Sequence, residues 1–88
     1  MSRNERQHTL DRAVISVLRQ VSGRAVPEAA LISAVEIKTD WLAPTRAEIE
    51  DAIRHAEREA RILGASLETG KKYKLTGDGE LWALEVRL

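Results

Sequence analysis

The apolar residues of this 88-residue chain change their spacing at Gly64, and that change most limits the folds it can adopt. Before Gly64 they recur every three or four residues, which is the period of an amphipathic helix. After Gly64 they alternate with polar residues, which is the period of a half-buried strand. Helical segments followed by strand segments predict the α+β class, and a chain of this length is expected to form one domain.

The segment that ends at Gly64 is predicted to be the clearest helix of the chain. Thr45 is the expected N-cap, and Glu48 completes a capping box in which two side chains satisfy free backbone N–H groups. Gly64 is the expected stop. The predicted buried stripe consists of Ile49, Ala52, Ile53, Ala56, Ala60 and Leu63.

Two further helices are predicted before this one. Thr9 is the expected N-cap of the first and Gly23 its stop, so residues 1–8 are predicted to form a flexible N-terminus and residues 9–88 the domain. The second is expected to have Pro27 at its first position and to end near Lys38. Trp41 and Leu42, in the next connector, are predicted to lie in the core. The apolar stripe of the first helix is Leu10, Ala13, Val14, Val17, Leu18 and Val21.

The alternating residues after Gly64 predict a β-hairpin with its turn at residues 70–72 and with Tyr73 and Leu75 on one face. Residues 78–88 fit two structures. We favour a helix capped by Asp78, because its residues have good helix propensity. The alternative is a third strand after a turn at residues 78–79, along which Trp82, Leu84, Val86 and Leu88 alternate. In the helix, Leu81, Leu84 and Leu88 are predicted to point inwards.

The composition excludes several classes of protein. The chain has no cysteine, so it has no disulfide or thiolate metal site, which suits a reducing, cytoplasmic compartment. No apolar run is long enough to cross a membrane, and we expect no membrane association. His8 and His55 are isolated, the carboxylates have cations one helical turn away, and no phosphate-binding glycine loop is present. We therefore expect no catalytic residues, no metal and no cofactor.

The charges sum to zero but are unevenly distributed along the chain. Residues 1–24 carry five arginines against two acids, a balance of +3. Residues 25–70 have a balance of −4, and residues 71–88 of +1. A nucleic-acid-binding protein commonly has a clear basic excess, which this chain lacks.

Two stretches carry a resemblance to a known family. Residues 52–64 resemble the third helix of winged-helix regulators, which runs directly into the wing. Residues 73–79, Tyr-Lys-Leu-Thr-Gly-Asp-Gly, resemble the Tyr-x-Leu-Thr-x-x-Gly signature of the second wing strand in PadR-like and related winged-helix transcription factors. Gly77 and Glu80 depart from that pattern, in which proline and a basic residue are frequent. The resemblance implies a three-helix bundle with a C-terminal β-hairpin wing, followed by a short terminal helix or strand.

In such a fold the third helix enters the major groove of duplex DNA and the wing contacts the backbone. Arg46 and Arg54 are the candidates for base edges, because guanidinium groups bind bases through two hydrogen bonds. Phosphate contacts are expected from the wing and from the ends of the helix. The candidate DNA-binding residues are thus Thr45, Arg46, Arg54, Arg58, Lys71, Lys72 and Lys74. An alternative reading treats them as ordinary solvated charges, since acidic residues lie among them.

Two questions about partners stay open on the sequence. The neutral charge also suits a winged-helix module that binds another protein instead of DNA. Trp82 would be exposed if residues 78–88 form a helix, so it is a candidate homodimer contact, since winged-helix regulators often pair through a terminal helix. Packing of Trp82 onto the first helix is the alternative.

Overall fold

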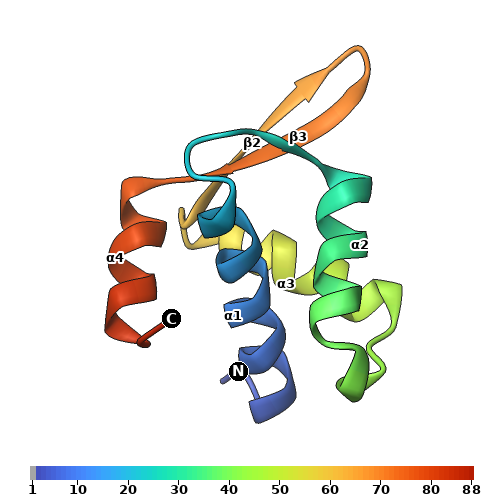
Figure 1. The fold of residues 1–88 in the computed structure, drawn as a ribbon, viewed down its shortest axis with the longest axis vertical. Helices are drawn as coiled ribbons and strands as arrows, with labels where there is room; N and C mark the ends of the chain where they lie inside the picture. Colours follow the sequence, from blue (N-terminus) through green and yellow to red (C-terminus); the bar gives the residue numbers. More distant parts are fainter. Residues whose placement is uncertain (1) are drawn as a thin grey trace.

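The computed structural model describes residues 2–88. The elements follow in the order α1 (Glu5–Gln20), β1 (Val26–Pro27), α2 (Glu28–Lys38), the 3-10 helix η1 (Asp40–Leu42), α3 (Arg46–Arg58), β2 (Ile62–Leu67), β3 (Gly70–Leu75) and α4 (Gly77–Glu85). In Figure 1, α1 lies between α2 and α4, α3 crosses behind α1, and the β2–β3 hairpin projects from one end of the helical body. The predicted α+β class is confirmed.

The three strands form one antiparallel sheet in the order β1-β3-β2. Ile62 lies opposite Leu75 and Leu67 opposite Gly70, so the hairpin turn consists of Glu68 and Thr69. The turn predicted at residues 70–72 is therefore wrong, because Gly70 already pairs as the first residue of β3. Strand β1 was not predicted, because two residues are too few to show an alternating pattern.

The core lies where α1, α2 and α3 meet the inner face of the hairpin. Ile49, Ile53 and Leu75 are buried there in one cluster with Val14 and Leu18, as predicted. Each buried side chain of this size contributes about 1.5–3 kcal/mol of transfer free energy. None of the helices formed by residues 2–88 has the length and apolar character needed to cross a bilayer.

Helix α1 begins earlier than predicted, because Asn4 and not Thr9 is its N-cap. The Asn4 side chain accepts a hydrogen bond from the backbone N–H of Gln7, and the Gln7 side chain accepts one from Asn4. The Thr9 hydroxyl instead donates to the Glu5 carbonyl at 3.0 Å. Residues 5–8 are thus helical. The mobility expected of residues 1–8 stays a prediction, and Met1 lies outside the described residues.

The connector after α2 contradicts the predicted place of Trp41. Its side chain is 73% exposed, while Leu42 packs against the core. Residues 40–42 form the single turn η1, in which adjacent side chains point in different directions. That turn directs Leu42 inwards, so Trp41 has to face solvent.

Helix α3 begins at the predicted Thr45–Glu48 capping box but ends at Arg58, earlier than predicted. Ala60 then adopts a left-handed backbone conformation with φ of 58°, which stops the helix without glycine. Ala60 and Leu63 are consequently exposed, and Ile62 is the buried residue instead. Gly64 lies within β2, where an added Cβ would stand 2.9 Å from a ring carbon of Tyr73.

The terminal segment is helix α4, as we favoured, but its buried face is not the predicted one. Thr76, and not Asp78, is the N-cap, and its hydroxyl accepts a hydrogen bond from Gly79. Gly79 and Ala83 are buried, because small side chains let the helix approach the body closely. The predicted inward residues Leu81, Leu84 and Leu88 are 60%, 65% and 40% exposed.

Candidate nucleic-acid interface

The solvent face of α3 carries the arginines that the sequence singled out. The capping box at Thr45 fixes the start of the helix, and Arg46, Arg54 and Arg58 are exposed along it. Thr45 itself is exposed at the N-terminus of the helix. Free backbone N–H groups and the positive end of the helix dipole make such an N-terminus favourable for an anion.

One carboxylate lies between the two arginines proposed to read bases. Glu50 contacts the Arg46 guanidinium at 3.4 Å through Oε1 and the Arg54 guanidinium at 3.5 Å through Oε2. Both are exposed i,i+4 pairs, which contribute about 0.3–0.5 kcal/mol each. Glu50 thus orients both guanidinium groups without holding them strongly.

The three hairpin lysines divide between the two faces of β3. Lys71 shares its face with the buried Tyr73, and its Nζ lies 3.2 Å from Oε1 of Glu57 on α3. That contact with Glu57, followed by the interaction with the Tyr73 side chain, raises the pKa of Lys71. Lys72 and Lys74 lie on the opposite, outer face. The structure therefore brings Lys72 and Lys74 together and sets Lys71 apart.

A polar hollow of about 290 Å³ separates the hairpin from the middle of α3. Glu28, Glu50 and Glu57 line it, together with Lys71 and Arg54. The Tyr73 hydroxyl donates a hydrogen bond to Glu28 Oε2 at 3.2 Å, and burial raises the pKa of Tyr73. Three carboxylates against two cations make this hollow more suitable for a cationic group than for a phosphate.

Ion pairs that the sequence did not suggest fasten the N-terminal residues to α3. Arg3 donates to both carboxylate oxygens of the buried Asp11 and, at 2.8 Å, to Asp51. Arg6 pairs with Glu48 in the same way. The Arg6 guanidinium is the main reason that the pKa of Glu48 is lowered to about 2. Arg3 and Asp51 are 48 positions apart and Arg6 and Glu48 are 42 apart, so no local pattern indicates these two pairings.

Trp82 is half-buried and packs against the core, beneath the Arg61 guanidinium, which lies 4.1 Å from the ring centroid. Helix α4, which carries Trp82, packs on α1, and α1 contributes to the core cluster that Trp82 touches. Packing of Trp82 directly onto α1, the alternative to a dimer contact, stays a prediction. A role of the remaining exposed edge of Trp82 in a homodimer stays a prediction.

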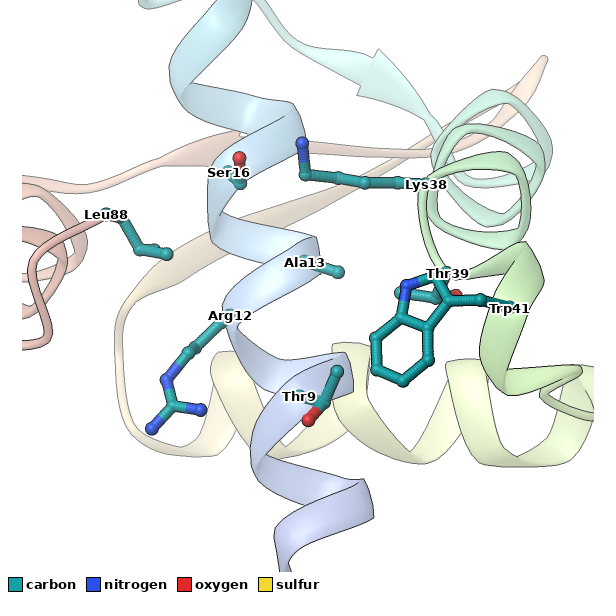
Figure 2. A pocket seen from close by; sticks show the side chains of 8 residues that line it. All are labelled: Thr9, Arg12, Ala13, Ser16, Lys38, Thr39, Trp41 and Leu88. Carbon is teal, nitrogen blue, oxygen red and sulfur yellow. The ribbon is translucent and has the colours of Figure 1, made fainter.

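A second hollow, mostly apolar and about 220 Å³ in volume, lies on the α1 side of the molecule. Figure 2 shows the Trp41 ring on one side of it, Leu88 on the other, and Ala13 of α1 between them. Arg12 and Lys38 are the charged residues of its lining. None of the candidate DNA-binding residues lies in it.

The two histidines differ in their surroundings. His8 is exposed, whereas His55 is half-buried and its Nε2 lies 4.0 Å from Asp11 Oδ2. The sequence showed both only as isolated histidines, so it did not indicate the enclosure of His55. Burial and the nearby Arg3 lower the pKa of His55. Across residues 2–88, no group of three or more His, Cys, Asp or Glu side chains is arranged to hold a metal.

Comparison with known proteins found no relative of this chain. A scan against protein-family models, a search of curated proteins and a search of solved structures each found no match for the chain. The chemistry of α3 and of the hairpin is therefore the basis for a function.

Proposed function

We propose that this chain is a winged-helix protein that binds duplex DNA as a small transcription regulator and catalyses no reaction. Helix α3 reads the major groove through its solvent face, and the β2–β3 hairpin is the wing that contacts the backbone. The order of elements supports this proposal, since three helices precede an antiparallel hairpin and β1 joins the same sheet.

The observation that carries the proposal is the pair of exposed arginines on the solvent face of α3, with Arg46 in its first turn and Arg54 beyond its middle. Arg46 and Arg54 present planar guanidinium groups, which match the O6 and N7 acceptors of guanine. Thr45 and Arg58 contribute phosphate contacts from the two ends of the helix. Lys72 and Lys74 do so from the outer face of the hairpin, whereas Lys71 has to leave Glu57 before it reaches a phosphate.

Fluorescence anisotropy with a labelled mixed-sequence duplex tests this function. Binding should weaken steeply between about 50 and 200 mM salt, because phosphate contacts release counterions. Replacing Lys72 or Lys74 by glutamine should reduce the salt slope by about 1 each, and Arg54→Gln should cost roughly 1–3 kcal/mol and blur the sequence preference. Lys38→Gln is the matched control, since Lys38 is exposed at the end of α2, and should leave binding unchanged.

Absence of binding at tens of micromolar protein in low salt would refute the proposal, because even non-specific affinity is expected in that range. The second candidate function is then a winged-helix module that docks a protein. The hollow lined by Glu28, Glu50 and Glu57 favours it, since a cationic side chain of a partner would fit there. Under either function we place the protein in the cytoplasm, and for DNA we expect a homodimer that presents two α3 helices to two half-sites.

A further inference from the structure

The two edges of the sheet differ in whether they can accept another strand. Strand β1 ends one edge after two residues, and its Pro27 has no N–H to donate. Strand β2 forms the other edge over six residues. In an antiparallel pair, alternate residues direct their backbone N–H and C=O groups away from the neighbouring strand. Across residues 2–88, no hydrogen bond joins the backbone of residues 63–67 to any element other than β3.

Strand β2 also lacks the features that normally protect an exposed edge. Edge strands are commonly blocked by charged residues, proline or a bulge. Residues 62–67 read Ile-Leu-Gly-Ala-Ser-Leu, with no charge and no proline, and their pairing with β3 runs without interruption. Leu63 and Leu67 are 60% and 52% exposed, with the exposed Ala65 between them on the same face. This edge is open, uncharged and apolar on its outer face.

We propose that β2 pairs antiparallel with β2 of a second copy of the chain, across a two-fold axis at Ala65. The two three-stranded sheets then become one six-stranded sheet. The interface is formed by β2 and not by Trp82, the candidate dimer contact, and its formation requires no DNA, so it goes beyond the proposed function.

The sequence of β2 complements itself in this register. Residues directly opposite each other in an antiparallel pair project to the same face. With Ala65 on the axis, Leu63 lies opposite Leu67 of the second copy, and Leu67 opposite its Leu63. The two alanines face each other at the axis, where the smallest side chain gives the closest approach. On the inner face, Gly64 lies opposite Ser66, and neither is bulky.

The charges near the edge favour a second copy over a charged peptide. Glu57 is the carboxylate nearest to Gly64, and Lys71 neutralises it. Lys72 and Lys74 lie on β3, so the lysines of the two copies are separated by two intervening β2 strands. That separation is about 14 Å, beyond the distance at which exposed charges act strongly in physiological salt. No charge on β2 itself selects an acidic or a basic partner.

A single introduced cysteine tests both the pairing and its register, because the chain has none of its own. In Ala65→Cys the two thiols of a pair would lie on Cα atoms about 5 Å apart, a distance suited to a disulfide. Under mild oxidation without DNA, A65C should form covalent dimers at least about tenfold faster than S33C, whose thiol on exposed α2 meets others only by collision.

The register gives a second, independent test. Cysteines at position 67 of both copies would lie about 13 Å apart, and the same holds for position 63. Neither L63C nor L67C should cross-link with itself, whereas a mixture of the two should. Equal rates for A65C and S33C, or self-linking of L67C as fast as the mixture, would overturn the proposal.

Light scattering on the unmodified protein completes the experiment. The mass should approach twice 9.8 kDa as concentration rises, and A65K should return it to that of one chain, since two lysines then face each other at the axis. Because Ala65 is exposed, a thermal melt should show that A65K still folds. A single-chain mass at about 1 mM protein refutes the pairing, because the dissociation constant would then lie above about 1 mM. A dimer that W82A abolishes and A65K leaves intact also refutes it.

Discussion

Gly79→Ala tests whether α4 is held on the body by close backbone contact. A Cβ at this position would stand 2.1 Å from the Arg61 carbonyl oxygen and 2.6 Å from Cδ1 of Leu75. The Arg61 oxygen cannot easily move, because it accepts a hydrogen bond from the Thr76 N–H at 3.1 Å. Helix propensity alone predicts a gain of up to about 1 kcal/mol for alanine over glycine. Overpacking at a contact this short costs about 1–3 kcal/mol, so we expect a net loss of about 1–2 kcal/mol.

Gly77→Ala is the matched control, because Gly77 belongs to the first turn of the same helix and an added Cβ meets nothing within 4 Å. Propensity then acts alone, and this variant should be as stable as the wild type or slightly more stable. In thermal melts followed by circular dichroism, G79A should unfold roughly 5–15 °C lower than the wild type. If G79A proves as stable as G77A, the reasoning from close contact is wrong.

Two further predictions concern the core and the half-buried His55. Ile53→Ala should lower the free energy of unfolding by about 2–4 kcal/mol, because Ile53 is 2% exposed. The control Arg54→Ala, on the solvent face, should change that free energy little. A melting temperature of I53A within a degree of the wild type would contradict the prediction. His55 has a lowered pKa in the fold, so its neutral form contributes stability that is present above its ordinary pKa of 6.5 and is lost as the pH falls below it. H55Q should therefore lose less stability than the wild type between about pH 7.5 and 5.5 in urea titrations, and equal losses would refute the role of His55.

The parts of the fold that the sequence predicted are those set by neighbouring residues. The Thr45–Glu48 capping box joins groups three residues apart, and the Ile49–Ile53 stripe repeats along a single helix. The alternation at Tyr73 and Leu75 is also local. Each of these patterns stabilises one structure whatever the rest of the chain does, so the start of α3 and the central core followed directly.

The predictions were wrong where tertiary contacts, and not the local sequence pattern, determine which side chains of an element are buried. In α4, hydrophobicity favours burial of Leu81 and Leu84, but Gly79 lets the helix approach the carbonyl of Arg61, and Gly79 and Ala83 are buried instead. Trp41 is exposed for a similar reason, because η1 can bury only one of two adjacent apolar side chains. Such choices depend on the tertiary contacts that form, which no single segment encodes.

The sequence named the candidate residues of the site, but it did not predict which of them form ion pairs. The sequence grouped Lys71 with Lys72 and Lys74, since all three lie within four residues beside the predicted turn. The pleat of β3 separates them, and Glu57 on α3 then holds Lys71. Helical spacing does bring Glu50 between Arg46 and Arg54, so that part of the surface was accessible to sequence reasoning.

The zero net charge conceals a difference between cations that are held and cations that can exchange partners. Arg3 is largely enclosed beside the buried Asp11 and Arg6 pairs with Glu48, so these two arginines do not add to a free basic surface, whereas Arg12 and Arg24 are exposed. Arg46 and Arg54 share only Glu50 in exposed pairs, which a base edge can replace at a cost below about 1 kcal/mol. Glu50 at the same time repels a phosphate that approaches between them. Under the proposed function, α3 therefore disfavours indiscriminate backbone binding and leaves both guanidinium groups oriented for guanine, so that contacts to bases, more than total charge, would determine where the protein binds.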